Sequence, residues 1–331
     1  MDRSIRTRPV ESNRAWRRKF TICKGKETMT ELNFLGTRKT GITISIVAIT
    51  VSILLLIVNG LNFGIDFTGG TEFRVLFHDA IEITDLRVAL GAIPADDIDL
   101  AGSVIQEVRG TEVRGTYEVI ITTPLDIELH RPIITAVETM LADTFPVIEE
   151  DISRRSVGHR ISRELVHRGW GAILLALVII LLYVSWRFRL RYAVGAVTAV
   201  VHDVMIALGV FALFQLEVNL ATIAAFLTIV GYSLNDTIVI FDRVRENLAT
   251  LKRTSIFDVL NRSINQSLSR TINTSITTLI PVVILFLFGG PVLRSFSVAL
   301  MIGVVVGTYS SMYVANPVIY AWTMRTDSKR R

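Results

Sequence analysis

Cysteine is almost absent from this sequence, and its histidines do not form a metal motif. The single cysteine, Cys23, excludes an internal disulfide, and the neighbouring letters FTICKGK contain no second metal ligand. Four histidines, His78, His130, His159 and His167, are scattered, and none has the spacing of zinc ligands. These absences exclude a disulfide scaffold, and we expect no bound metal and no cofactor.

Lysine is missing from residues 60–168, which hold nineteen acidic residues against ten arginines. The whole chain still has a net charge of +5, because residues 1–40 hold eleven Lys/Arg against four acids. Basic residues that flank apolar runs are typical of cytoplasmic anchoring and not of a surface that binds nucleic acid. We therefore expect no nucleic-acid partner.

Hydrophobic residues make up half of the chain, and the mean hydropathy is +0.49. This composition is typical of a polytopic membrane protein, in which each helix needs about 20 mainly apolar residues to cross the bilayer. Six runs meet this requirement, at 41–59, 169–187, 192–214, 218–241, 271–289 and 296–320. The first run lacks a clear cleavage site, so we interpret it as an uncleaved span. Met29 is an alternative start, which would leave residues 1–28 as an extension.

The charges predict the orientation of these spans. Lys/Arg residues mark the N-terminal segment, the letters RFRLR, the 242–270 stretch and the tail, whereas QLEVN at 215–219 has none. By the positive-inside rule both termini are cytoplasmic. The predicted organisation is a basic N-terminal segment at 1–40, a first span at 41–59, an external domain at 60–168, a five-helix membrane region at 169–320 and a cytoplasmic tail at 321–331.

The external segment has the pattern of a small α+β domain. Apolar and β-branched periodicity predicts strands at 71–77, 98–108, 115–123 and 147–154, and helices at 84–91 and 127–143. The order βαββαβ indicates a ferredoxin-like fold. Its apolar or edge-strand surface offers a place to bind unfolded polypeptide.

Three ionisable residues stand out: Asp203 and Asp236 lie within predicted spans, and Arg270 opens the fifth. Each costs about 2.5–3.5 kcal/mol to insert near a helix centre, so it needs a partner, water or a task. From the helical rise, Asp236 lies roughly 8 Å from the cytoplasmic boundary and Arg270 reaches a similar level, so we expect them to pair. Asp203 lies roughly 16 Å deep, one or two turns above them.

The functional interpretation of these residues is a proton relay. Desolvation favours the protonated form of a carboxylate and a nearby guanidinium favours the charged form, so small helix movements could switch Asp236. Two structural alternatives remain open, because Asp236 with Arg270 could be a structural ion pair, and Asp203 with His202 could be a water-exposed helix feature. Polar neighbours support the site on both helices, at Ser233, Asn235, Asn273, Thr274 and Thr277. Arg270, Thr274, Thr277 and Pro281 recur at helical spacing, with Asn273 adjacent, so we expect this stripe to face the interior of the bundle.

A glycine-rich stretch follows the first span. Gly64, Gly69 and Gly70 permit positive φ and close backbone approach where the chain enters the first strand. Asp66 is suited to capping a turn. We interpret these residues as a stiff junction between the membrane region and the external domain.

Three motifs resemble the SecF family of bacterial protein translocase subunits, which belongs to the resistance-nodulation-division superfamily. They are FGIDFTGGTEFRV at 63–75, YSLNDTIVIFDRVREN at 232–247 and SLSRTINTS at 267–275. Together with the six spans and the one large external loop, the resemblance covers about residues 29–322.

This resemblance implies a component of the bacterial inner membrane that uses the proton gradient to help pull exported polypeptide outward. It implies SecD, the SecYEG channel and the exported chains as partners, with YajC and YidC as further ones, and no enzymatic activity. Asp236 and Arg270 match the family's residues for proton conduction, whereas Asp203 rests on its depth alone.

Two other functions were weighed on the residues. An independent proton-coupled transporter of the same superfamily is the alternative, although six spans are half of the usual pseudo-symmetric set. An intramembrane aspartyl protease would need Asp203 and Asp236 to share a proton, and the expected Gly-x-Gly-Asp frame is replaced by Leu234 and Asn235 next to Asp236.

Overall fold

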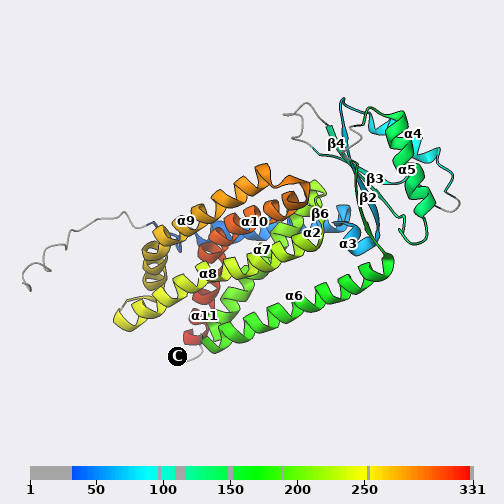
Figure 1. Ribbon diagram of the computed structural model, residues 1–331. Helices are drawn as coiled ribbons and strands as arrows, with labels where there is room; N and C mark the ends of the chain where they lie inside the picture. The colour runs from blue at the N-terminus through cyan, green and yellow to red at the C-terminus, as the bar shows by residue number, and fades with distance from the viewer. Residues whose placement is uncertain are drawn as a thin grey trace, which may run out of the picture.

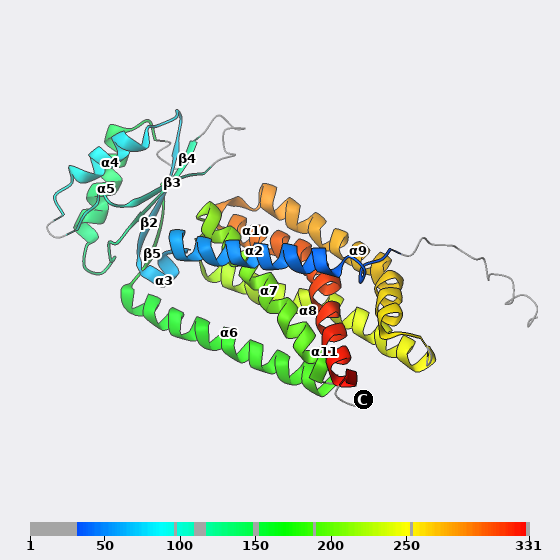
Figure 2. The same cartoon turned by 180° about the vertical axis from the view of Figure 1, so that it is seen from behind.

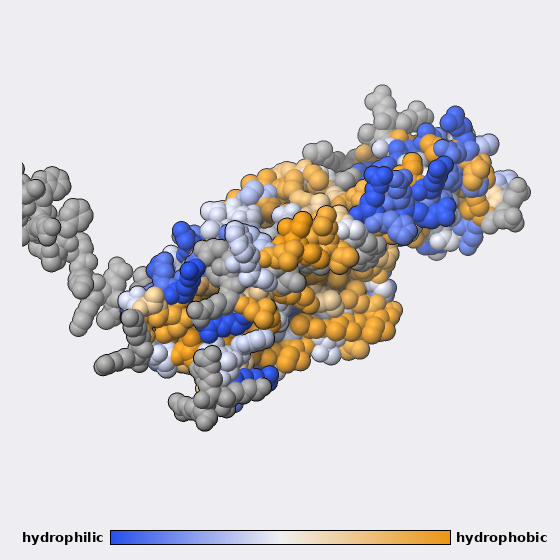
Figure 3. Space-filling view, turned by 90° about the horizontal axis from the view of Figure 1, so that it is seen from below, coloured by the Kyte–Doolittle hydropathy of each residue, from blue (hydrophilic) through white to orange (hydrophobic). Residues whose placement is uncertain are grey.

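The computed structural model describes residues 32–95, 98–108, 117–147, 152–187, 190–251 and 254–328. A helical bundle carries a small sheet domain at one end (Figures 1 and 2). Apolar side chains dominate the surface of the bundle, while polar ones gather on the sheet domain (Figure 3). Cys23 and Met29 lie outside the described residues.

Five helices in the described part of the chain are long and apolar enough to cross a membrane. Four are α2 (Arg38–Asn59), α7 (Leu190–Phe214), α8 (Leu220–Thr250) and α9 (Ile256–Phe288), and the fifth, Leu293–Thr326, runs through α10 (Gly290–Ser310), η3 (Ser311–Ala315) and α11 (Asn316–Ser328). The prediction of a helical membrane protein with a sheet domain is therefore confirmed. The remaining predicted span, 169–187, lies within α6 (His159–Arg187), which is not among the five.

Two helices continue beyond the predicted spans into polar sequence. The expected span 218–241 belongs to α8, which ends at Thr250, and the expected span 271–289 belongs to α9, which begins at Ile256. The Ser255 side chain caps α9 by accepting a hydrogen bond from the Asp258 N–H at 3.1 Å. The α8–α9 hairpin consequently projects beyond the bundle at the end remote from the sheet domain, here called the distal end (Figures 1 and 2).

The sheet domain contains β2 (Gly70–Phe77), α4 (Ile83–Gly91), β3 (Val104–Val108), β4 (Tyr117–Thr123), α5 (Arg131–Thr144) and β5 (Ser153–Val157). The strands form an antiparallel sheet in the order β3-β4-β2-β5. Helices α4 and α5 cover one face (Figure 1). The large buried side chains of the core come from both layers, and they are Phe73, Phe77, Leu86, Leu90, Ile121, Ile134 and Leu141.

Three predicted limits in this domain need correction. The strand expected at 98–108 begins only at Val104, because a turn precedes it in which the Asp99 side chain accepts the Gly102 N–H at 3.0 Å. The helix expected at 127–143 begins at Arg131, where proline occupies its first turn. The strand expected at 147–154 is β5, and residues 148–151 lie outside the described part.

Two connections join the sheet domain to the bundle. Strand β1 (Asn62–Phe63) pairs in parallel with β6 (Glu217–Val218), which links the chain after α2 to the loop between α7 and α8. A single residue, Gly158, separates β5 from α6. The sheet domain is thus tied to the membrane helices by backbone pairing and by a continuous strand-to-helix passage.

Candidate functional site

Asp203 lies at the centre of the bundle and is completely buried. Its carboxylate accepts hydrogen bonds from the hydroxyls of Ser233 on α8 at 2.6 Å and Ser310 on α10 at 2.7 Å. A third bond, of 2.8 Å, joins it to Nδ1 of His202. Helix α10 approaches closely because a Cβ on Gly307 would lie 3.4 Å from the Ser233 backbone. Asp203 therefore connects three helices through a fully hydrogen-bonded carboxylate.

His202 precedes this aspartate on α7 and is also buried, with 2 % of its surface exposed. Its Nδ1 bonds to Asp203, whereas its Nε2 has no hydrogen-bond partner among the residues that the structure describes. The ring stacks on Tyr309 of α10, with centroids 6.1 Å apart. The Tyr309 hydroxyl in turn donates to the carbonyl of Gly41 on α2 at 2.7 Å.

Asp236 is the second buried carboxylate of the bundle, with 2 % exposure. The hydroxyl of Thr274 on α9 donates to its Oδ1 at 3.4 Å. Its Oδ2 is buried without a partner in the described residues. Since buried polar atoms are usually paired, Asp236 is only partly satisfied and its free oxygen is available to a proton.

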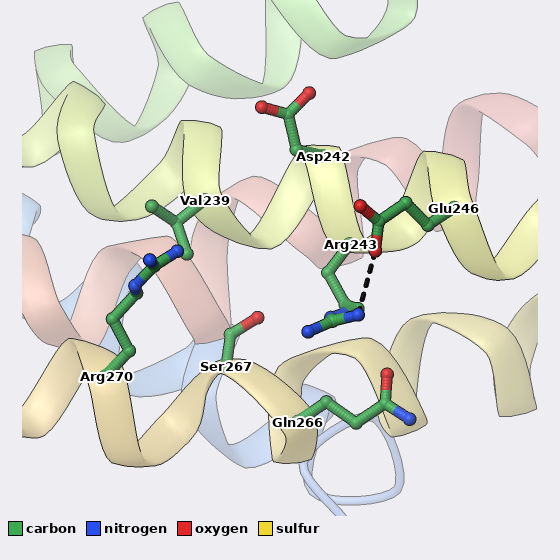
Figure 4. A pocket seen from close by; sticks show the side chains of 7 residues that line it. All are labelled: Val239, Asp242, Arg243, Glu246, Gln266, Ser267 and Arg270. Atoms are coloured by element: carbon green, nitrogen blue, oxygen red, sulfur yellow. Dashed lines mark hydrogen bonds and ion pairs between the residues drawn. The ribbon is translucent and has the colours of Figure 1, made fainter. Parts of the chain in front are cut away.

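Arg270 does not pair with Asp236, which corrects the expected ion pair. Helices α8 and α9 are antiparallel, and Thr274 takes the place opposite Asp236, so Arg270 lies one turn nearer the distal end. There it extends from α9 toward Val239 of α8 and lines a cavity of about 300 Å³ (Figure 4). Among the described side chains no ion pair joins Arg270 to Asp236, and Arg270 is exposed.

The cavity beside Arg270 contains charges of both signs. It lies between α8 and α9, and Arg243 and Glu246 form an ion pair of 2.8 Å within it (Figure 4). Its other lining residues are Val239, Asp242, Gln266, Ser267 and Arg270. This cavity provides a polar opening at the distal end, one turn away from Asp236.

The expected supporting residues divide between two faces. Ser233 bonds to Asp203, not to Asp236, and Thr274 contacts Asp236 as described. Asn235, Asn273 and Thr277 are exposed. The exposed stripe on α9, formed by Arg270, Asn273 and Thr277, corrects the expectation that these polar side chains face the interior of this bundle.

Sequence reasoning missed two parts of the Asp203 network. It did not include Ser310, although this serine lies three residues after Gly307 of the letters GVVVG and so shares one helix face with that glycine. It noted His202 only as a neighbour of Asp203. Packing of three helices around one carboxylate brings these residues together, and no single motif encodes it.

The junction after α2 is held by Asp66 and by close glycine contacts. Asp66 accepts a hydrogen bond from the Leu220 N–H at the start of α8 and pairs with Arg155 of β5, both at 3.0 Å. Gly69 and Gly70 have φ values of 74° and 123°, in the region that favours glycine. Gly64 has an ordinary φ, but a Cβ there would collide with Glu217.

Glu217 is the unusual carboxylate of this junction. Burial raises its pKa, the neighbouring Glu72 and Asp66 act in the same direction, and Arg155 opposes them. One of its carboxylate oxygens is buried without a partner in the described part of the protein. The junction therefore holds three carboxylates close to one guanidinium.

Other site chemistries find little support. No group of three His, Cys, Asp or Glu side chains within the described ranges could hold a metal ion. Asp203 and Asp236 accept hydrogen bonds from different hydroxyls. Among the described residues, no hydrogen bond joins the two carboxyl groups to each other. This is not the pair of carboxylates sharing a proton that an aspartyl protease needs.

Sequence comparison identifies the family. A family profile described as "Protein export membrane protein SecD/SecF, C-terminal" matches residues 136–325, and one described as "SecD/SecF GG Motif" matches residues 54–81. The protein translocase subunit SecF of Petrotoga mobilis is 38 % identical over 308 residues, which are 92 % of this chain and 100 % of that protein. The chain belongs to the SecF family.

Further relatives of the SecF family agree with this assignment. The SecF subunit of Rhodothermus marinus is 41 % identical over 90 % of this chain and 95 % of its own length. The crystal structure of SecDF from Thermus thermophilus, described as a translocon-associated membrane protein, superposes with a TM-score of 0.78 at 37 % identity. That match covers 88 % of this chain and 39 % of SecDF, so the chain spans about two fifths of that protein. Membership of the SecF family makes this a membrane protein of protein transport and translocation.

Proposed function

We propose that this chain works with SecD to promote the outward movement of exported polypeptide through the SecYEG channel, and that the proton gradient drives this step. Asp236 is the single observation that carries the proton part. It is a buried carboxylate with one free oxygen, in a helix bundle where such a group is costly and is usually functional. The polar cavity one turn away offers it a route to the distal aqueous side.

Helix α8 supplies a mechanical link between Asp236 and the sheet domain. Its first turn is held by Asp66 of the junction, and Asp236 lies sixteen residues after Leu220, or roughly 24 Å along one continuous helix. Protonation of Asp236 removes a buried charge that the Thr274 hydroxyl contacts. A change in the α8–α9 contact would therefore reach the junction through the body of α8.

The exposed polar stripe on α9 supports SecD as the partner. Arg270, Asn273 and Thr277 are exposed on a helix that the bilayer would otherwise surround with hydrocarbon, where an arginine is costly. A second membrane subunit that covers this stripe would remove the cost. The SecDF structure supports this arrangement, since this chain matches only 39 % of that larger protein. The stripe also disfavours the alternative of an independent transporter, because a lone chain would leave it in lipid.

We also propose the finer topology. Helix α6, together with the five apolar helices, gives six spans with both termini in the cytoplasm of the inner membrane and the sheet domain outside. The antiparallel order β3-β4-β2-β5 and the succession βαββαβ support a ferredoxin-like domain. We expect no enzymatic activity, no cofactor besides the coupling proton, and contacts with the exported chains and with YajC and YidC.

The variant Asp236→Asn tests the proton part of this function. It keeps the size of the side chain and one acceptor oxygen for the Thr274 hydroxyl but cannot bind and release a proton. Measured in vesicles that contain SecD, SecYEG and this subunit, it should assemble normally and abolish the stimulation of export by a proton gradient. Asp85→Asn, an exposed aspartate on α4, serves as the matched control. Stimulation of Asp236→Asn vesicles equal to that of the control would refute the relay.

A further inference from the structure

His202 is the described histidine that lies in the middle of a membrane helix. It follows Leu190 at the start of α7 by twelve residues, or roughly 18 Å, so it lies far from both ends of the bundle. The other four histidines lie in the sheet domain or in the first third of α6, at His78, His130, His159 and His167. A buried histidine at this depth has no contact with bulk water and must be satisfied by the protein.

The hydrogen bonds of Asp203 determine which ring nitrogen of His202 carries a proton. Hydroxyls of Ser233 and Ser310 donate to this carboxylate, and an ionised carboxylate is a pure acceptor. With Asp203 ionised, the third bond has Nδ1–H of His202 as its donor, at 2.8 Å. In this tautomer Nε2 carries a lone pair, and the carboxylate on the other side of the ring stabilises an added positive charge.

Nε2 of His202 is thus a buried basic nitrogen without a hydrogen-bond partner among the described residues. The neutral ring leaves the His202–Asp203 pair with one negative charge in the bundle, and a proton on Nε2 would neutralise it. Charge neutrality is favoured where water is excluded. Unpaired buried polar atoms are uncommon in native proteins, so the unpaired Nε2 of His202 calls for an explanation, and binding of a proton provides one.

The titratable groups on the helices packed against α7 at this level are few. They are Asp203 on α7, Tyr232 and Asp236 on α8, Tyr309 on α10 and Tyr313 of η3. The Tyr232 hydroxyl donates to Ser275 of α9 at 3.5 Å, and Tyr313 stacks on Tyr309 at 5.1 Å. Helix α2 contributes the Ser45 hydroxyl and the Gly41 carbonyl there, and its charged residues Arg38 and Lys39 lie at its start. The charged residues of α6 and α11 lie toward the ends of those helices. Among the side chains that the structure describes on these elements, no cation occupies the place that a protonated Nε2 would take.

We infer that Nε2 of His202 is a second proton-binding site of the bundle, with Asp203 as its counter-ion, and that it belongs to the same relay as Asp236. Ser233, which bonds to the counter-ion Asp203, precedes Asp236 by three residues on α8, so Asp203 contacts α8 about one helical turn from Asp236, roughly 4.5 Å along the axis. His202 extends the relay from Asp236 across the middle of the membrane toward α2 and Tyr309. The physiological purpose of this site rests on the proposed proton coupling, whereas protonation itself can be measured without it.

The variant His202→Asn distinguishes two roles of His202, as a proton-binding site and as a hydrogen-bond donor that only holds Asp203 in place. The Asn side-chain amide can donate to Asp203 as Nδ1–H does, but it cannot be protonated. If His202 only holds Asp203 in place, this variant keeps full activity. If His202 binds a proton, gradient-driven proton flux in vesicles should fall at least about tenfold, as expected when a positioned proton-transfer group is removed. His78→Asn, an exposed histidine of the sheet domain, is the matched control.

Protonation is measured directly on protein labelled with ¹⁵N-histidine in lipid vesicles, together with SecD. Solid-state NMR should show one ring signal that is lost in His202→Asn and kept in His78→Asn. This signal should convert from neutral imidazole to imidazolium when spectra are recorded over a pH series from about 9 down to 5. His202→Gln gives a second assignment if the Asn variant does not fold.

The outcomes are distinct. A His202 ring that stays neutral, or stays charged, over the whole range overturns the proposal. Titration with undiminished proton flux in His202→Asn removes His202 from the relay and also overturns it. If Asp236→Asn leaves export unchanged while His202 still titrates, the proposed function fails and the proton-binding site stands.

Discussion

Asp203 and Asp236 show what the sequence can and cannot predict about single residues. Hydropathy singles out both acids, because an aspartate in an apolar run is conspicuous. Helical rise gives only an approximate level, and it placed Arg270 beside Asp236 although Thr274 occupies that position. The direction in which each side chain points depends on the rotation of neighbouring helices about their axes, which packing decides. The sequence therefore predicted the carboxylates but not their partners.

Ser310 allows the Asp203 network to be tested. Ser310→Ala removes a hydrogen bond to a buried carboxylate, so it should lower the free energy of unfolding by about 1.5–3 kcal/mol. Unfolding of the purified subunit in detergent, followed by circular dichroism, measures this loss.

Ser297→Ala is the control for this prediction. Ser297 lies on the same helix and is equally buried, but its hydroxyl bonds only to the Leu293 carbonyl one turn earlier. This variant should change the stability much less. Equal losses in the two variants would contradict a special role of Ser310.

Gly70 is a second residue whose identity the structure explains. Its φ is 123°, and a Cβ would collide with the Thr123 carbonyl of β4, so Gly70→Ala should destabilise the protein by roughly 1–3 kcal/mol. Gly231→Ala on α8 meets no atom within 4 Å and should be neutral or slightly stabilising. Thermal unfolding of the two variants compares them, and a Gly70→Ala protein as stable as Gly231→Ala would show that the turn relaxes at no cost.

At the scale of elements, the type and order were predictable while the ends were not. Helices α8 and α9 extend beyond their apolar runs, because a helix that is already formed continues into polar sequence at little cost. The Ser255 cap further stabilises the start of α9. Strand β3 is shorter than its apolar letters because a side-chain turn at Asp99 interrupts them. The pairing of β1 with β6 escaped prediction, because two-residue strands carry no periodic signal.

The raised pKa of Glu217, in β6, predicts that the stability of the protein depends on pH. Its raised pKa means that the folded state favours the protonated form. Protonated Glu217 therefore stabilises the folded state fully below its unfolded pKa of about 4.3. This stabilisation is lost as the pH rises through the pKa of Glu217 in the folded state. Glu217→Gln mimics the protonated form, so its melting temperature should exceed that of the wild type at pH 8 and match it near about pH 4.

Glu107→Gln provides the reference for this pH series, since Glu107 is exposed on β3. Its difference from the wild type should stay small at every pH. A Glu217→Gln advantage that shrinks as the pH rises has the wrong sign, and it would show that Glu217 is stabilised as a carboxylate.

At the scale of the whole molecule, α2 and α9 are the most exposed of the five apolar helices. Only 17 % of the apolar window of each is buried in this chain, against 50 % for α8, and of the two it is α9 that carries the polar stripe. The sequence predicted that the polar stripe of α9 needs a protein environment, but it could not tell an internal surface from one that faces another subunit. The six-span count itself suggested half of a larger assembly.

The reactivity of single introduced cysteines tests whether the second subunit covers the polar stripe of α9. In a Cys23→Ser background, Thr277→Cys on the polar stripe should react with a membrane-permeant maleimide in the isolated subunit and be protected at least about fivefold in the SecD complex, as a buried interface excludes the reagent. Val283→Cys, exposed about 120° around the axis of α9 from Thr277, should react equally in both samples. Equal labelling of Thr277→Cys with and without SecD would place the partner elsewhere.

The passage from β5 to α6 through Gly158 alone has a consequence for the working cycle. Asp126 fixes this passage, since its carboxylate accepts the His159 N–H at 3.2 Å, and the backbone N–H groups of Glu128 and His159 lower its pKa. Because this connection is a single residue long and is held by hydrogen bonds, a force on the sheet domain is transmitted to α6 as well as to α8 through the junction. Coupling between two sites is reciprocal, so under the proposed function a chain that resists export would alter the proton affinity of the bundle. The load on the exported chain and the proton occupancy of the bundle would then depend on each other.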